Sequence, residues 1–258
     1  MDDSMDMLKR DFLPADLERE IAGTDVSGTV VVQARQTVQE TGWLLELAGR
    51  FPVIKGVVGW VDLQSGDLKD QLDGFAKHPK LSGARHVIQD EPDDDFMLRP
   101  PFLKGMEMLQ EYHLTYDLLI FPRHLTKALE LVKLFPGVEF ILDHMSKPPV
   151  RTGVIHPWKE DIEALAGQPN VWCKVSGMVT EADHRDWKYE QLVPYMNVVL
   201  QAFGAGRIMV GSDWPVCTLA GAYSRVMDVP VRFFGKLNGI DRQKIFMQNA
   251  VDCYKLEI

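Results

Sequence analysis

Residues 139–144 read EFILDH, an apolar run that ends in an aspartate and a histidine, and similar runs recur along the chain. Most of these runs are apolar at successive positions, which is typical of parallel strands covered by helices on their outer face. The pattern therefore predicts parallel strands. The seven predicted strands are Gly28–Arg35, Ile54–Leu63, Leu81–Ile88, Leu114–Phe121, Glu139–His144, Val171–Gly177 and Arg207–Asp213.

Helical patterns separate the predicted strands. One of them begins after Thr37, a residue type that caps helix N-termini. Strands that alternate with helices predict an α/β fold with a parallel sheet. The predicted helices are Asp16–Ala22, Val38–Arg50, Leu68–His78, Pro101–Tyr112, Arg123–Phe135, Trp158–Gly167, Gln191–Phe203 and a closing helix over Asp241–Tyr254.

The composition is that of an ordinary globular protein, with 46% hydrophobic and 25% charged residues among 258. No low-complexity linker divides the chain, so we expect a single domain over residues 1–258. The net charge of −9 repels phosphate backbones, which argues against a nucleic-acid partner.

The chain carries an odd number of cysteines, three, and no CxxC pair, which is typical of a reducing compartment. The first residues, MDDSMDMLKRDF, are too charged for a signal peptide, and no apolar run approaches the ~18 residues of a membrane span. We therefore expect a cytoplasmic protein with no membrane partner.

The arrangement of the strands favours a (β/α)8 TIM barrel over a doubly wound sheet. The first predicted strand is followed by ARQTVQE instead of a glycine-rich phosphate turn, and no GxGxxG or GxxxxGK[ST] motif occurs. The length suits a barrel of ~250 residues. A barrel has eight strands and we count seven, with only helix-like sequence in residues 1–27, so we expect the first strand of the barrel to be missing from this chain.

Polar residues close almost every predicted strand, and catalytic groups of TIM barrels lie at the carboxyl ends of strands. Each also has a structural interpretation. His144 is compatible with a buried histidine bonded to a carbonyl, Asp213 with a turn cap before Pro215, and Lys174 with a buried ion pair. We interpret the acidic run Asp90–Asp95 as a solvated loop, because it lacks the spacing of a cation site. The polar strand ends are Gln33, Arg35, Trp60, Asp62, Arg85, His86, Tyr116, Asp117, Arg123, Asp143, His144, Lys174, Ser176, Asp213 and Trp214.

Several segments in order resemble the amidohydrolase-related TIM-barrel metal-dependent hydrolases, and within them the sugar-lactonase branch of L-fuconolactonase and L-rhamnonolactonase-like proteins. The resemblance covers nearly the whole chain. It is carried by DFLPADL, GTVVVQARQ, GVVGWVDL, GARHVIQDEPD, YDLLIFPRHL, ILDHMSKP, KVSG, GSDWPVC and NAVDCY.

The resemblance implies roles for individual residues. His144 corresponds to a histidine that binds metal or polarises a carbonyl, and Asp213 to the general base that handles the nucleophilic water. The resemblance also implies that His144 and Asp213 are ligands of a divalent metal ion such as Zn²⁺ or Mn²⁺. Arg85, His86, Tyr116 and Arg123 fall in segments that line the substrate pocket of this branch.

One departure concerns the metal. Family members carry an HxH pair in their first strand, and this chain has no HxH. That agrees with the strand count. We therefore expect a truncated or alternatively started form, or an inactive relative. A catalytic zinc ion takes three protein ligands, and without the HxH pair only His144 and Asp213 remain.

We predict a hydrolase that opens the lactone ring of a sugar acid. Asp213 would act as general base, and His144 with Arg85 or a divalent ion would stabilise the oxyanion. His86, Tyr116, Arg123, Lys174 and Trp214 are the predicted substrate contacts, with Arg123 and Lys174 best placed for the product carboxylate.

Two alternatives stay open at this point. One is a metal-dependent decarboxylase of the same superfamily. The other is an inactive or truncated relative that acts as a binding protein. An open barrel edge exposes unpaired backbone groups, which is compatible with a homodimer.

Overall fold

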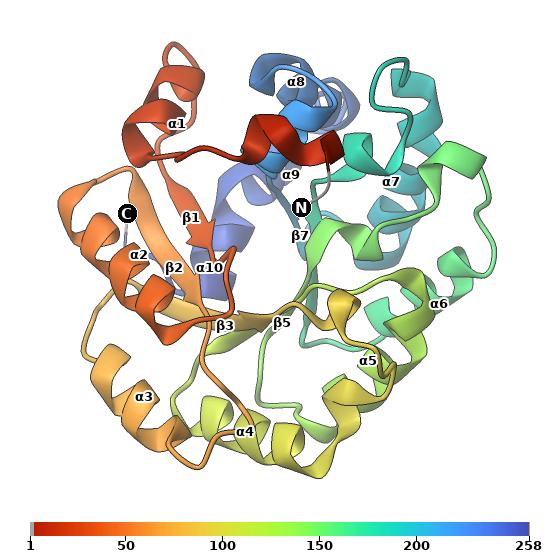
Figure 1. Ribbon diagram of the computed structural model, residues 1–258. Coiled ribbons are helices and arrows are strands. Elements are labelled where there is room, and N and C mark those ends of the chain that lie inside the picture. The colour runs from red at the N-terminus through yellow and green to blue at the C-terminus, as the bar shows by residue number, and fades with distance from the viewer. Residues whose placement is uncertain (1–2, 258) are drawn as a thin grey trace.

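A computed structural model describes residues 3–257 and contains one parallel sheet of seven strands in chain order. The sheet curls, and the helices lie in a ring around it (Figure 1). This confirms an α/β barrel in which one strand of eight is missing. The strands are β1 (Thr29–Val32), β2 (Ile54–Gly59), β3 (Leu81–His86), β4 (Thr115–Leu118), β5 (Phe140–Leu142), β6 (Val171–Val175) and β7 (Ile208–Val210).

Ten α-helices lie within the described part of the chain. Most follow a strand, as expected. They are α1 (Pro14–Ile21), α2 (Val38–Arg50), α3 (Leu68–Phe75), α4 (Pro100–Glu111), α5 (Leu125–Leu134), α6 (Trp158–Ala166), α7 (Tyr189–Phe203), α8 (Tyr223–Phe234), α9 (Gly239–Gln243) and α10 (Asn249–Tyr254).

The predicted helices agree with the structure apart from two segments. Val38–Arg50 is correct at both ends, and the Thr37 side chain accepts a hydrogen bond from the Glu40 N–H, which confirms the cap. The sequence pattern missed α8, which contains Pro230 in its interior. The prediction of one closing helix over Asp241–Tyr254 was wrong in detail, because a π-helical turn, η9 (Lys244–Gln248), separates α9 from α10.

Alternate residues of each strand face opposite sides of the sheet, because side chains alternate along a β-strand. Tyr116 pairs with Phe140 on one face, and the next residues, Asp117 and Ile141, pair on the other. Tyr116 and Phe140 belong to the large core between sheet and helices. Ile141 belongs to a separate cluster inside the barrel.

The C-terminal segment fills the barrel interior. Within residues 3–257, β1 and β7 are the two edges of the sheet and do not pair with each other. Cys253 and Tyr254 of α10 pack with Val58 and Met209 in the interior cluster, against partly buried side chains of β1. In Figure 1, α10 lies beside β1 in the middle of the helix ring. An apolar segment thus occupies the gap between the sheet edges.

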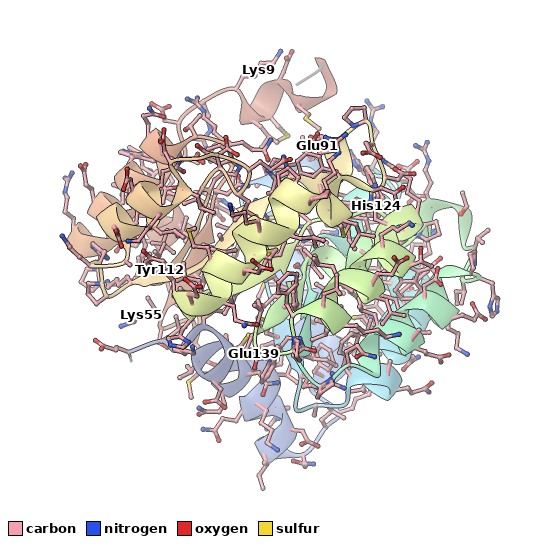
Figure 2. The ribbon with its side chains drawn as sticks, turned by 90° about the horizontal axis from the view of Figure 1, so that it is seen from below. Lys9, Lys55, Glu91, Tyr112, His124 and Glu139 are labelled. Carbon is pink, nitrogen blue, oxygen red and sulfur yellow. The ribbon has the colours of Figure 1, made fainter. Side chains whose placement is uncertain are left out.

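The two ends of the barrel are distinct (Figure 2). Glu91 and His124, which follow β3 and β4, lie at the carboxyl end together with Lys9, while Lys55 and Glu139 lie toward the opposite end. The N-terminal η1 (Asp3–Leu8) contacts η8 (Val216–Leu219), which follows β7. The segment after η1 places the Phe12 ring edge-on against Trp214, with 5.3 Å between centroids.

No helix in residues 3–257 combines the length and apolar character needed to cross a membrane. Within the same residues Cys173, Cys217 and Cys253 are free and buried.

The packing of α4 on the loop after β2 depends on Gly105. A Cβ atom at this position would clash with the backbone carbonyl oxygen of Leu63. We expect Gly105→Ala to lower the free energy of unfolding by about 1–3 kcal/mol, since the backbone must shift. Gly74→Ala on α3 is the matched control, because a Cβ atom there would have no neighbour within 4 Å and alanine favours a helix by up to ~1 kcal/mol. Urea unfolding measures both. Equal effects of the two substitutions would contradict this packing.

Candidate active site

A carboxylate held by two cations lies inside the barrel. Asp143, the residue after β5, is fully buried. Its Oδ2 accepts a hydrogen bond from Arg85 Nη1 at 2.8 Å, and its Oδ1 accepts one from Lys174 Nζ at 2.6 Å. Such charge-assisted bonds are about twice as strong as neutral ones. They join β3, β5 and β6 through one side chain.

Asp117 of β4 extends this cluster to the C-terminal helix. Its Oδ2 accepts hydrogen bonds from Lys174 Nζ at 2.9 Å and from the Tyr254 hydroxyl at 2.8 Å. Burial raises the pKa of Asp117 to about 6, against the opposing effect of the Lys174 charge. Tyr254 therefore caps the ion cluster from inside the barrel.

The pKa values of Asp117 and Asp143 are shifted in opposite directions. Burial would raise the pKa of Asp143, but Lys174 and Arg85 outweigh it and hold that pKa well below its usual range. Burial would lower the pKa of Lys174, and the two carboxylates outweigh it in turn and raise that pKa. At neutral pH the centre of the cluster is thus an ionised Asp143 between two cations.

The backbone directly after Asp143 is strained. Four consecutive residues, 144–147, have φ between 49° and 57°, in the left-handed region that costs roughly 1–2 kcal/mol per non-glycine residue. The turn is held by its neighbours. The Trp158 indole N–H donates to the Met145 carbonyl at 2.9 Å, and the Lys147 N–H donates to the His144 carbonyl at 2.8 Å. Strain of this kind occurs where the surrounding structure fixes a functional group.

This turn presents His144 to Asp213. The imidazole Nε2 lies 3.7 Å from Asp213 Oδ1, and both side chains retain some exposure, 11% and 15%. Burial lowers the pKa of His144 and outweighs the carboxylates of Asp213 and Asp143, so the ring is neutral at pH 7. His144 and Asp213 are both predicted site residues, and the structure brings them together from the segments after β5 and β7.

Ser176 fixes the orientation of the ring. Its Oγ lies 2.8 Å from His144 Nδ1, and the serine is buried. Gly177 is in the left-handed conformation at φ 65°, and a Cβ there would lie 2.7 Å from His144 Nδ1. Only glycine therefore leaves room for the imidazole against this backbone.

Counting hydrogen bonds assigns the imidazole proton. Within the described chain, the Ser176 hydroxyl has no polar partner other than His144 Nδ1. If Nδ1 carried the proton, the buried serine O–H would lack an acceptor, which costs about 1–3 kcal/mol. The hydroxyl therefore donates to Nδ1. Nε2 then carries the proton and lies 3.7 Å from Asp213 Oδ1.

Three of the other predicted site residues lie close to this pair. Arg85 and Lys174 lie in the ion cluster beneath it, each bonded to Asp143. Trp214 follows Asp213 directly and packs partly buried against Phe12. Arg85 and Lys174 thus support the site from below, while Trp214 borders it.

Three predicted substrate contacts lie elsewhere. Tyr116 is fully buried on the outer face of β4, edge-on to Phe102 and Phe140, because it differs by one strand position from the inward Asp117. Arg123 is half exposed and bonds to Asp94 at 2.9 Å. The structure does not bring Tyr116 or Arg123 to the His144–Asp213 pair.

His86 belongs to a small cluster of its own. Its Nε2 lies 2.6 Å from Glu91 Oε1, and its Nδ1 accepts a hydrogen bond from the Trp60 indole at 3.2 Å. The ring stacks on Phe96, with 4.8 Å between centroids. Both ring nitrogens are therefore engaged by protein groups.

The acidic loop Asp90–Asp95 carries paired charges. Asp93 bonds to Arg99, Asp94 to Arg123 and His124, and Asp95 to Lys127. These cations neutralise the carboxylates that would otherwise attract a metal ion. The interpretation as a structural loop agrees with these contacts.

The residues present do not fit a catalytic zinc ion. Within residues 3–257 no three His, Cys, Asp or Glu side chains form a group that could hold a metal. His144 and Asp213 supply two ligands, one fewer than catalytic zinc sites take. In the assigned tautomer, Nε2 also presents a proton where a ligand would present a lone pair.

The sequence did not identify Asp117, Asp143 and Ser176 as site residues. All three close predicted strands, which is the signal that could have found them. Their roles depend on which face of the strand they occupy and on partners far away in the sequence. Tyr254, 137 residues after Asp117, had no local signal at all.

Polar side chains at the carboxyl ends of barrel strands are typical of TIM-barrel enzymes. The comparisons with known proteins identify the family. The amidohydrolase family model matches residues 5–256, and this chain belongs to that family. A protein of Burkholderia ambifaria named L-fucono-1,5-lactonase is 39% identical over 98% of this chain and 89% of its own length. A Burkholderia multivorans protein of the same name is 34% identical over 98% of this chain and 88% of its length.

A solved structure supports the same assignment. The crystal structure of an amidohydrolase from Burkholderia multivorans with bound zinc superimposes with a TM-score of 0.96 at 34% identity. The match covers 99% of this chain and 93% of that one. The zinc belongs to that protein, and the described residues here retain only a two-ligand pair.

The assigned tautomer can be tested at Ser176. We expect Ser176→Ala to remove the bond that holds the His144 proton on Nε2 and to reduce kcat about tenfold, since one hydrogen bond contributes roughly 1–1.5 kcal/mol. Long-range ¹H–¹⁵N NMR of the imidazole should show protonated Nε2 in the wild type and a mixture of tautomers in the variant. Ser82→Ala, at the amino end of the barrel, is the control. A wild-type spectrum with protonated Nδ1 would refute the assignment.

Proposed function

We propose that this chain hydrolyses the ring ester bond of a sugar lactone of the kind for which its Burkholderia relatives are named. The observation that carries the proposal is the His144–Asp213 pair, which is partly exposed at the carboxyl end of the barrel with 3.7 Å between Nε2 and Oδ1. The two relatives named L-fucono-1,5-lactonase, similar over 98% of this chain, support the choice of substrate.

The proposed reaction begins with water. Asp213 takes a proton from the water molecule as its oxygen attacks the lactone carbonyl carbon. The carbonyl oxygen gains negative charge, and the His144 Nε2–H donates a hydrogen bond to it, a contribution of about 3–4 kcal/mol to the transition state. The ring C–O bond then breaks, and Asp213 returns its proton to the alkoxide that leaves. The product is an open aldonic acid with a new hydroxyl group, which releases its carboxyl proton to solvent and becomes the aldonate.

The remaining residues have supporting roles in this proposal. Arg85 and Lys174 act through Asp143, whose position sets the turn that carries His144. Trp214 offers an apolar wall to the sugar ring. A divalent ion such as Zn²⁺ or Mn²⁺ takes no part in the steps above, because the described residues do not supply its ligands.

A panel of aldonolactones tests the proposal, with acid release followed by a pH indicator. The protein is treated with chelator and then given Zn²⁺ or Mn²⁺. We expect hydrolysis of L-fucono-1,5-lactone to survive chelation. Hydrolysis only after added metal would contradict the mechanism, and no hydrolysis by folded protein under any condition would contradict the function.

Asp213→Asn tests the general base. Asp213 has φ 57°, and asparagine tolerates this left-handed conformation nearly as well as aspartate, so the backbone should be unchanged. We expect kcat to fall at least ~100-fold, since a positioned base contributes about 10²–10⁴. Asp186→Asn, at an exposed carboxylate, is the charge-matched control. Wild-type turnover in Asp213→Asn would exclude Asp213 as the base.

A further inference from the structure

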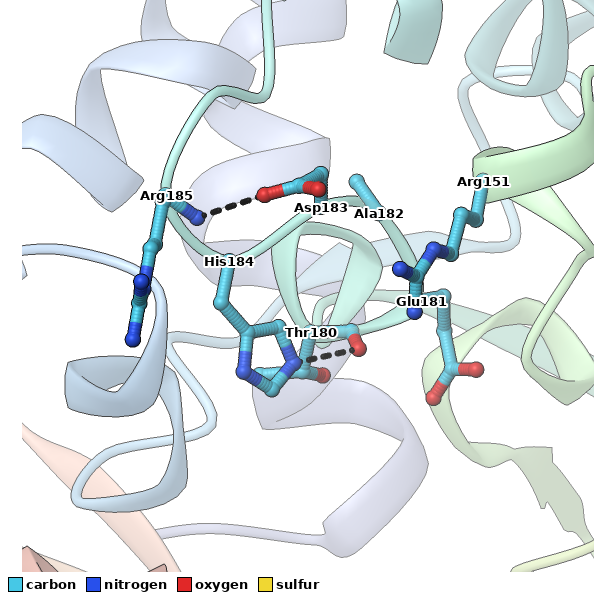
Figure 3. Close-up of a pocket in the computed structure, with 7 residues that line it drawn as sticks. All are labelled: Arg151, Thr180, Glu181, Ala182, Asp183, His184 and Arg185. Carbon is cyan, nitrogen blue, oxygen red and sulfur yellow. Dashed lines mark hydrogen bonds between the residues drawn. The ribbon is translucent and has the colours of Figure 1, made fainter. Parts of the chain in front are cut away.

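A hollow of about 550 Å³ lies between η6 (Val150–Thr152) and η7 (Met178–Glu181), the turn that follows Ser176 and Gly177. It is formed by η7 and the loop after it, with η6 on the opposite wall, and we call it the η7 hollow (Figure 3). Because η7 directly follows Ser176 and Gly177, the hollow opens at the same end of the barrel as the pair. Its lining residues are Arg151, Thr180, Glu181, Ala182, Asp183, His184 and Arg185.

Glu181 is the lining residue of the η7 hollow whose carboxyl lies within electrostatic reach of Asp213. Its carboxyl is partly buried and has no hydrogen bond or ion pair with any residue in 3–257. Burial raises its pKa, with Lys147 acting against this effect and Asp213 adding to it, so both groups lie within electrostatic reach. A partly desolvated carboxyl without donors gains stability when a ligand supplies them.

The other polar groups of the hollow divide into engaged and available ones. The Asp183 carboxylate accepts hydrogen bonds from the backbone N–H groups of Arg185 and Asp186, and His184 Nε2 bonds to the Thr180 carbonyl. The guanidinium groups of Arg151 and Arg185 form no ion pair within the described chain. An acceptor and two donor groups therefore remain available.

This combination suits a neutral, polyhydroxylated ligand. Each hydroxyl group donates one hydrogen bond and accepts others, so a carboxylate and guanidinium groups together satisfy neighbouring hydroxyls. A simple anion would be repelled by Glu181 and Asp183, and a metal cation by the two arginines.

We propose that the η7 hollow binds the hydroxyl groups of the substrate, with Glu181 as the main acceptor and Arg151 as a donor from the opposite wall. This inference rests on the proposed lactone hydrolysis and makes Glu181 a determinant of specificity for hydroxylated rings. The ring carbonyl then lies at the His144–Asp213 pair while the hydroxyls extend over η7.

Glu181→Gln tests the proposal by keeping the shape and removing the charged acceptor. We expect the KM for L-fucono-1,5-lactone to rise about tenfold with kcat within twofold. The KM for δ-valerolactone, which has the ring and no hydroxyls, should stay unchanged. Asp183→Asn is the matched control in the same hollow, and its KM values should stay within twofold of the wild type.

Binding of L-fucitol, measured by calorimetry, separates this inference from the proposed function. L-fucitol carries the hydroxyls and has no lactone bond, so its binding needs no hydrolysis. Weaker binding to Glu181→Gln than to Asp183→Asn supports the hollow even if no lactone is opened. If Glu181→Gln leaves both the KM and the binding of L-fucitol unchanged, the proposed role of the η7 hollow is overturned, while the proposed lactone hydrolysis stands. A wild-type protein that does not bind L-fucitol would also overturn the role of the hollow.

A second variant covers a folding failure of Glu181→Gln. Arg151 is exposed, so Arg151→Met should fold normally. We expect this variant to weaken L-fucitol binding at least threefold and to leave δ-valerolactone hydrolysis unchanged. If Arg151→Met binds L-fucitol with wild-type affinity, Arg151 is not a donor from the opposite wall. If Glu181→Gln also fails to fold, that same result overturns the whole proposal.

Discussion

The contact between Asp143 and its two cations supports both the barrel and the site. Taking a carboxylate out of water costs several kcal/mol, and Arg85 and Lys174 offset that cost only together, at 2.8 and 2.6 Å. Removing one partner of such a buried pair typically destabilises a protein by about 3–5 kcal/mol. Since Lys174 also binds Asp117, and Asp117 binds Tyr254, the same contacts tie the C-terminal helix into the open barrel.

The geometry of the His144–Asp213 pair follows from this anchor. Asp143 immediately precedes the left-handed turn 144–147, so its fixed side chain sets where the turn begins. Ser176 and Gly177 then determine the orientation of the imidazole, and Asp213 approaches from β7. Energy stored in the strained backbone is offset by the ion cluster and by the Trp158 bond to Met145. A neutral imidazole N–H beside a carboxylate is the arrangement that the proposed lactone hydrolysis uses.

Much of this architecture is predictable from the sequence, because apolar runs and helical periods are local signals. All seven strands and the boundaries of α2 follow from them, whereas the roles of His144 and Asp213 are implied by the resemblance to the sugar lactonases. The sequence pattern does not show whether Tyr116 or Asp117 faces the barrel interior, because a parallel strand is buried on both faces. The role of Tyr254 and the left-handed turn depend on contacts distant in sequence, for which no local signal exists.

The most direct test of this account is turnover of L-fucono-1,5-lactone per folded molecule in Asp143→Asn, with the folded fraction taken from circular dichroism. Asparagine keeps the shape and removes the charge that Arg85 and Lys174 share. The account predicts a loss of about 3 kcal/mol in the free energy of unfolding and a fall of at least about tenfold in kcat among the molecules that remain folded. Wild-type kcat per folded molecule would contradict it, because His144 would then hold its position without the buried ion cluster.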